Sequence, residues 1–219
     1  MKKIVLIAII ISIFIFMIIF IQNNYKTEIF GNNIDSKSCE DLQKYILNIS
    51  AYNAVVDVTV NSNKTKNQYR LKQKYKNGEY YQEVIEPETI KGTSITYDGR
   101  KLKIENSNLN LNKIYENYKY IASNQLDLQD FLEDYKSSSD ASLKEEENQI
   151  ILETTVKNET RYLAKKILYV DKKTEKPTKL EIKDNTQNIS VYILYKEIEI
   201  NSLQENDILA FKLQSWKQI

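Results

Sequence analysis

The alternation of apolar and polar positions is clearest over residues 168–201, where it predicts three consecutive antiparallel strands. Residues 179–183, KLEIK, place Leu180 and Ile182 on one face and charged side chains on the other. This period of two is typical of a sheet that is buried on one side and solvated on the other. Charged and polar turns separate the strands, the first of them at residues 171–176.

A second group of strands is predicted before residue 106. Residues 51–61 and 69–75 alternate apolar and polar side chains, and Asn77-Gly78 and Asp98-Gly99 suit two-residue hairpin turns. A last short strand is predicted at residues 208–213. The expected order is a helix, about five strands, a helical insert and about six strands. Because strands and helices do not alternate as βαβ units, we predict a mainly β protein with α-helices (α+β) and an antiparallel sheet.

The helices are predicted at residues 37–49 and 126–135, each with an apolar stripe at spacings of three and four. A further helical turn is expected around residues 114–121. We expect this insert to cover the concave face of the sheet, either as a permanent plug, which is favoured, or as a movable lid. Its candidate residues are Ile114, Tyr118, Ile121, Leu128, Phe131 and Leu132. The same inward residues would suit a dry core or a cavity for an apolar ligand, so both alternatives stay open.

The order of features in residues 168–201 carries a family resemblance. A strand ends in Tyr169-Val170-Asp171, and then follow a charged turn, Pro177, the strand KLEI, a polar turn and a long strand ending in EIEIN. This order resembles the C-terminal half of LolA-like proteins, the lipoprotein carrier and sorting proteins. Residues 50–106 add a less specific match. Within that group, the chain is most similar to the clostridial germination lipoprotein GerS and its relatives.

The resemblance implies a half-open antiparallel β-barrel of about 11 strands with covering helices. It contains no catalytic motif. A GerS-related protein is expected to bind a cortex-modifying N-acetylmuramoyl-L-alanine amidase in spore formation or germination, without catalysing a reaction itself. A LolA-like protein is instead expected to be a carrier or acceptor of lipid or lipoprotein.

The N-terminus predicts the compartment. Residues 4–21 are uncharged and predominantly apolar, and they follow Lys2 and Lys3. A helix of this length is just long enough to cross a hydrocarbon core of ~30 Å. Because no small-residue cleavage site follows, we predict an uncleaved anchor over residues 1–24. Its representative residues are Ile4, Phe14, Phe20 and Ile21.

A tether over residues 25–35 and one domain over residues 36–219 complete the predicted organisation. The only cysteine, Cys39, lies too far beyond the apolar segment for lipidation, which departs from the lipoprotein members of the family. Lysines before the anchor favour a single-pass protein of the cell membrane with its domain outside the cytoplasm, and the forespore or spore envelope is one such location.

Composition excludes several classes of function. The chain has no histidine and one cysteine, so it lacks Ser-His-Asp and Cys-His nucleophile pairs and the usual zinc ligands. Its four glycines form no phosphate-binding loop. Without Lys2 and Lys3, the totals of 31 basic and 30 acidic side chains become 29 and 30. The chain therefore lacks the excess of basic side chains that is typical of nucleic-acid-binding proteins. We therefore predict no metal, no cofactor and no enzymatic activity.

One group of acids leaves an enzyme as a third alternative. Asp127, Asp130, Glu133 and Asp134 could supply paired carboxylates for glycoside hydrolysis, although the solvated face of a helix is the simpler interpretation. A protein partner or self-association through an exposed edge strand is also expected, because unpaired strand edges bind other chains. The sequence does not indicate which strand is the edge.

Overall fold

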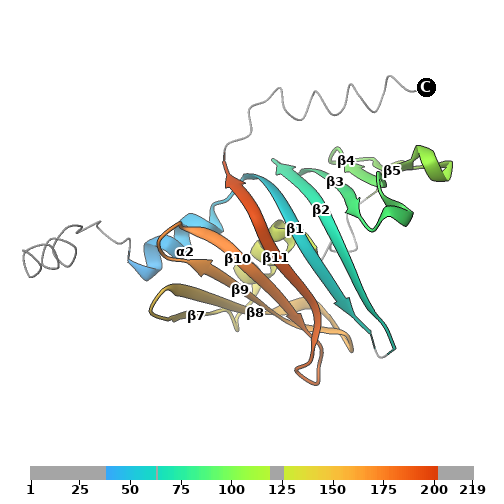
Figure 1. Cartoon of the computed structure of the whole chain (residues 1–219). Helices are drawn as coiled ribbons and strands as arrows, with labels where there is room; N and C mark the ends of the chain where they lie inside the picture. Colours follow the sequence, from blue (N-terminus) through green and yellow to red (C-terminus); the bar gives the residue numbers. More distant parts are fainter. Residues whose placement is uncertain (1–37, 63, 119–125, 202–219) are drawn as a thin grey trace, which may run out of the picture. The chain divides into compact units, whose positions relative to one another are not determined.

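Eleven strands form one antiparallel sheet in the computed structural model, which describes residues 38–62, 64–118 and 126–201 (Figure 1). The strands of the first half are β1 (Ala51–Asn61), β2 (Lys66–Lys76), β3 (Glu79–Glu86), β4 (Ser94–Tyr97), β5 (Leu102–Asn106) and β6 (Leu111–Tyr115). Those of the second half are β7 (Ser142–Glu145), β8 (Gln149–Thr160), β9 (Leu163–Asp171), β10 (Lys176–Lys183) and β11 (Ile189–Ile200). The helices are α2 (Cys39–Leu47) and α3 (Leu128–Ser137), with short 3-10 turns η1 (Glu88–Ile90) and η2 (Ser107–Leu109).

The strand order is β6-β5-β4-β3-β2-β1-β11-β10-β9-β8-β7. Each half is a run of neighbouring hairpins, and the two halves join where β1 pairs with β11 in the middle of the sheet. Over the described residues the sheet is open, with β6 and β7 as its edges. The prediction of an antiparallel α+β fold is confirmed, but six strands precede α3 and five follow it. The strand predicted at residues 208–213 lies outside the described residues.

The hairpin between β2 and β3 follows directly from the sequence. Asn77 and Gly78 both have positive φ, 49° and 85°, as a two-residue type I′ turn requires. Glycine adopts this conformation without steric cost, and asparagine tolerates it better than most residues. The turn sets the register in which Gln73 faces Gln82 and Tyr75 faces Tyr80.

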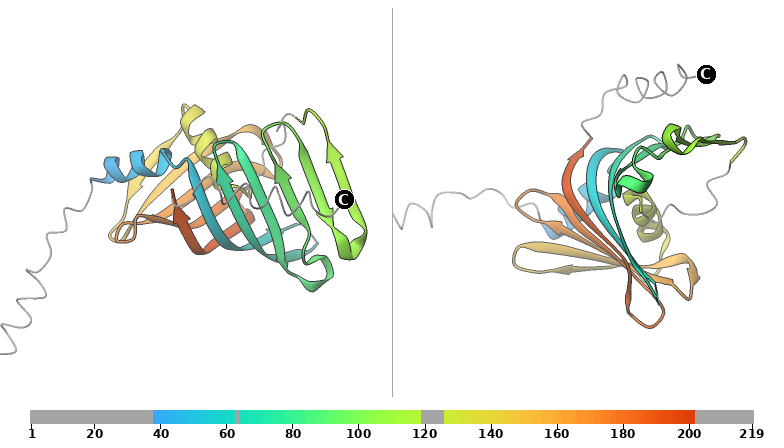
Figure 2. Two further views of the ribbon diagram at one scale, coloured as in Figure 1. Left: turned by 90° about the horizontal axis from the view of Figure 1, so that it is seen from above. Right: turned by 45° about the vertical axis from the view of Figure 1, so that its right-hand side comes forward.

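The sheet curves, and α3 lies against its concave face (Figure 2). On β1, alternate residues from Tyr52 to Val58 point into this face and are buried, whereas Asp57 lies on the outer face and is partly exposed. The same alternation continues through the central strands. The fully buried core includes Ile46, Tyr52, Val56, Leu128, Phe131, Leu132, Ile150, Leu152, Leu168, Val170, Leu180, Ile182 and Ile193. One apolar face therefore forms the core, and both helices cover it.

The predicted first helix is confirmed, within slightly narrower bounds. It spans Cys39–Leu47, and the Ser38 side chain caps it by accepting a hydrogen bond from the Asp41 N–H at 3.1 Å. Leu42 and Ile46 are buried one turn apart, which places the apolar stripe on the sheet.

The predicted helical turn around Ile114 is wrong. Ile114 belongs to β6, where it lies opposite Lys103 of β5, and Tyr118 follows that strand. The third candidate of this turn, Ile121, lies outside the described residues. Pairing with β5 satisfies the backbone of β6 directly, and Asn110 turns the chain with a φ of 50°. Three apolar or aromatic residues at spacings of four and three were therefore too weak a signal for a helix.

The predicted membrane anchor, with Ile4, Phe14, Phe20 and Ile21, also lies outside the described residues. Within the described ranges, neither helix has the length and apolarity needed to cross a membrane.

The packing of α3 on the sheet predicts that replacing two leucines by alanine changes the free energy of unfolding by very different amounts. Leu132→Ala is expected to lower the free energy of unfolding by about 2–5 kcal/mol, because Leu132 is 0% exposed and its removal leaves a cavity. Leu109→Ala, at a position that is 51% exposed, should change it by less than about 0.5 kcal/mol. Urea unfolding monitored by circular dichroism measures both. Equal effects would contradict the packing of α3 described above.

Candidate functional site

Helix α3 fills the concave face with apolar side chains. Leu128, Phe131 and Leu132 are all 0% exposed and belong to the same core cluster as residues of both sheet halves. Asp127 caps the helix by accepting a hydrogen bond from the Gln129 N–H at 3.0 Å. These three plug residues therefore fill the part of the concave face that lies directly under them.

A buried lysine fixes the other side of α3. Lys166 of β9 is 0% exposed, and its Nζ donates to Asp134 Oδ2 at 2.6 Å and also to Asp130. The two acids are one helical turn apart, so both reach the same ammonium group. Asp134 also accepts from the Lys157 N–H at 3.3 Å. Burial raises the pKa of Asp130, and the attraction to Lys166 opposes this shift.

The strand pattern explains how Lys166 comes to be buried. It lies between Thr154 and Ile182 in the register of the sheet, and both of these neighbours are buried. Counting back by two from Leu168 places Lys166 on the inward face. Lys166 was not predicted as a core residue, because the apolar alternation is clear only from residue 168 and the preceding Lys165-Lys166 pair gives no apolar signal.

A second polar cluster lies beneath the start of α3. The Tyr52 hydroxyl donates a hydrogen bond to Asp127, and both side chains are buried. Gln73 donates to the Leu126 carbonyl at 2.8 Å and to Gln82 at 3.3 Å. Burial raises the pKa of the Asp127 carboxyl to about 7, although the hydrogen bonds from Tyr52 and the Gln129 N–H oppose this shift. These contacts tie the N-terminus of α3 to β1 and β2.

The side chains around this cluster open into a pocket of about 320 Å³ between α3 and the first half of the sheet. Carboxyl groups and tyrosines form most of its wall. The lining residues are Tyr75, Gly78, Tyr80, Tyr97, Gly99, Asp127, Gln129, Asp130 and Glu133. A pocket with this many acidic groups is poorly suited to an acyl chain, because an apolar ligand would desolvate them without replacing their hydrogen bonds.

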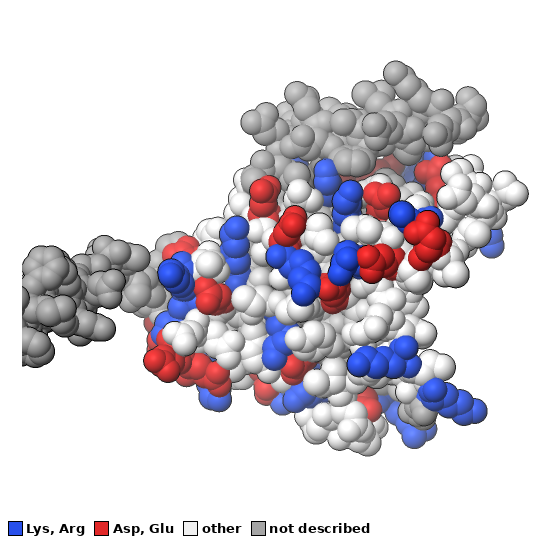
Figure 3. All heavy atoms as spheres, viewed as in Figure 1, with Lys and Arg blue, Asp and Glu red and all other residues white. Residues whose placement is uncertain are grey.

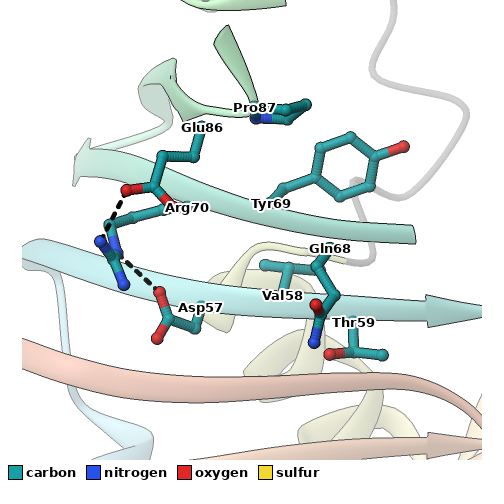
Figure 4. A pocket seen from close by; sticks show the side chains of 8 residues that line it. All are labelled: Asp57, Val58, Thr59, Gln68, Tyr69, Arg70, Glu86 and Pro87. Atoms are coloured by element: carbon teal, nitrogen blue, oxygen red, sulfur yellow. Dashed lines mark hydrogen bonds and ion pairs between the residues drawn. The ribbon is translucent and has the colours of Figure 1, made fainter. Parts of the chain in front are cut away.

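A second pocket, of about 310 Å³, lies where β3 ends (Figure 4). Arg70 spans its wall, donating to Asp57 and to Glu86 at 2.8 Å each. Nearby, basic and acidic side chains are interspersed over the face of the sheet that points away from α3 (Figure 3). The guanidinium of Arg70 is thus already neutralised, and the pocket offers no unpaired charge for an anionic ligand.

The acids of α3 do not form the solvated face expected from the sequence. Asp127 and Asp134 are buried, and Glu133 is the exposed member of the group. Asp130 and Asp134 share one lysine, so they are not a free acid and base flanking a substrate bond. No group of three or more Cys, Asp or Glu side chains within the described residues could hold a metal ion. The cluster is organised to hold a helix.

The two edges of the sheet differ in their side chains. At β7, Lys172 pairs with Glu145 at 2.6 Å, and Leu143 is partly buried. At β6, Ile114 is 50% exposed and Tyr115 is 44% exposed. Together with Leu109, these are three of the five exposed large hydrophobic residues in the described part of the chain. The apolar exposed surface is therefore concentrated at the β6 edge.

Comparison with known protein families shows the family of this chain. The profile of the sporulation protein YdcC-like family matches residues 2–209. The chain belongs to the YdcC-like family. No curated protein sequence matches this YdcC-like chain.

Solved structures with a similar fold include an uncharacterised conserved protein from Thermus thermophilus. It is 11% identical, with a TM-score of 0.51, and the match covers 79% of the YdcC-like chain and 93% of the other. The structure of the CwlD amidase in complex with the GerS lipoprotein from Clostridioides difficile matches with 28% identity and a TM-score of 0.48. This match covers 77% of the YdcC-like chain and 96% of the other chain. The LolA superfamily protein NE2245 from Nitrosomonas europaea matches with 11% identity and a TM-score of 0.40. This match covers 77% of the YdcC-like chain and 96% of the other chain. The resemblance to LolA-like and GerS proteins is confirmed.

The buried lysine gives a prediction with a neighbouring control. Lys166→Met should lower the free energy of unfolding by about 3–5 kcal/mol, because it leaves one buried and one partly buried carboxylate without their cation. Lys165→Met removes a partly exposed pair with Glu153 and should cost about 0–1 kcal/mol. Adding Asp130→Asn and Asp134→Asn to Lys166→Met should recover part of the loss. Chemical denaturation measures all three, and a Lys166→Met protein as stable as wild type would contradict the role of this lysine.

Asp127 gives a prediction on pH dependence. The folded protein keeps the Asp127 proton up to about pH 7, whereas the ordinary pKa of 3.8 applies after unfolding. Its contribution to stability is therefore complete below pH 3.8 and is lost as the pH rises through 7. Asp127→Asn keeps an oxygen that accepts from the Gln129 N–H and does not titrate. Between pH 4 and pH 7, wild type should lose roughly 2–4 kcal/mol relative to this variant; parallel stability curves would contradict the prediction.

Proposed function

We propose that this YdcC-like protein is a non-catalytic accessory protein that binds a protein partner in spore formation or germination. The observation that carries the proposal is the occupied concave face. Leu128, Phe131 and Leu132 fill it, and the acids of α3 are engaged by Lys166 instead of being open to a substrate. Membership of a sporulation protein family supports the biological setting.

The partner class in this proposal is a cortex-modifying N-acetylmuramoyl-L-alanine amidase. The choice follows from the resemblance of residues 168–201 to GerS-related proteins.

We also propose that residues 4–21 anchor the chain in the cell membrane, with residues 36–219 outside the cytoplasm, because the segment is apolar and follows two lysines. A carrier of lipid or lipoprotein is the alternative function, and the filled core and the acidic pocket make it the weaker one.

The proposal predicts binding without hydrolysis. The full-length chain, purified in a mild detergent, is expected to co-purify with the cortex amidase of the same bacterium when the two are co-expressed. Alone, it should release no products from purified peptidoglycan, and the amidase serves as the positive control for the assay. Peptidoglycan cleavage by the chain alone, or failure to bind the amidase, would overturn the proposal. Acyl chains found by mass spectrometry of the extracted protein would favour the carrier.

A further inference from the structure

The β6 edge combines exposed apolar side chains with an unpaired backbone. β6 pairs with β5 on one side and has no strand on the other among the described residues. The N–H and C=O groups along its outer side therefore pair with no described strand, and groups of this kind can pair with another chain. Ile114 and Tyr115, both large and exposed, lie on opposite faces of this short strand. A strand added here would cover side chains on both faces.

The side chains of β6 define what such a strand should contain. Leu111, Lys113 and Tyr115 lie on one face, opposite Asn106, Ile104 and Leu102 of β5. The middle one of the three is charged. A strand laid antiparallel to β6 would place three of its own side chains opposite this apolar–basic–apolar series.

Lys113 lacks the partner that neighbouring lysines have. Lys101 pairs with Glu116 at 2.9 Å, and Lys103 pairs with Glu105 at 2.6 Å. Lys113 forms no ion pair with any described residue and is exposed. A carboxylate directly opposite it on an added strand would complete the local pattern of charge pairs.

A second copy of this chain fits the edge less well. If two β6 strands pair antiparallel over their full length, the register places Lys113 of one copy opposite Lys113 of the other. Like charges directly opposite each other are destabilising. Registers that separate the lysines leave part of this five-residue strand unpaired. A different protein with an acidic residue in its strand avoids this repulsion.

We infer that β6 binds an extended strand of a partner protein, in which a carboxylate lies opposite Lys113 and apolar residues lie opposite Leu111 and Tyr115. This inference deepens the proposed function, because it gives the surface on which the partner would bind. It does not depend on the partner being an amidase. The other edge, β7, has its Glu145 carboxylate paired with Lys172 and lacks the exposed apolar series.

A peptide pair tests the chemistry without any assumed partner. The peptide Thr-Ile-Thr-Glu-Thr-Ile-Thr presents isoleucine, glutamate and isoleucine on one face, and its twin has lysine in place of glutamate. Added to the full-length chain, the glutamate peptide should shift the amide NMR signals of residues 111–115 and bind about threefold to tenfold more tightly than the twin. With Lys113→Glu, the preference should reverse. Equal binding of both peptides, or shifts confined to β7, would overturn the inference.

The amidase complex provides a second test with matched control residues. Tyr115→Asp and Ile114→Asp should each weaken amidase binding about tenfold or more, because they place a charge in the centre of the interface. Tyr162→Asp and Ile189→Asp are the controls, since these residues are the same types, exposed by 55% and 36%, and remote from β6 in the strand order. They should bind as wild type does. Circular dichroism checks that all four variants are folded.

The outcomes separate this inference from the proposed function. If the amidase binds and Tyr115→Asp binds equally well, the β6 inference fails and the accessory function stands. If the glutamate peptide binds β6 but the amidase does not bind at all, the surface is supported and the amidase proposal fails. Sedimentation that shows a dimer in wild type and a monomer in Tyr115→Asp would make a second copy the occupant, which would also overturn the inference.

Discussion

The pairing of Lys166 with Asp130 and Asp134 determines how the rest of the structure is arranged. A curved sheet with one apolar face needs a cover, and apolar packing alone gives little directional preference to a helix lying across it. A lysine buried in β9 restricts that choice, because α3 must bring two carboxylates to its ammonium group. The hydrogen bond of Tyr52 to Asp127 fixes the start of the same helix.

This arrangement also limits what the protein does chemically. Acids that look available for catalysis in the sequence are used to hold α3, and their desolvation is offset by the lysine and by backbone N–H groups. The attraction between these charges is consistent with a fixed cover, since moving α3 away would separate the Lys166 ammonium group from both carboxylates at once. The outer surface, where charges alternate in sign, and the β6 edge then remain for recognition.

Much of the fold was predictable because it depends on local rules. Asn77-Gly78 specifies a hairpin through backbone sterics, and the alternation in KLEIK specifies a strand with one buried face. The plug residues of α3 also follow from helical spacing. The helical prediction around Ile114 failed because β5 offered hydrogen bonds to that segment, and a pairing partner distant in sequence outweighs a weak local preference.

The sequence by itself determined most of the strands, the hairpin turns, the antiparallel class, and the absence of histidine chemistry, since each depends on neighbouring residues or on composition. Only the tertiary structure decided which acids are buried, that Lys166 binds two of them, and that β6 is the edge with exposed apolar residues. The physical reason is that burial, pairing of charges and edge position depend on which strands become neighbours. These relations join residues far apart in the chain, such as Asp130 and Lys166, and the pattern of either segment alone does not contain them.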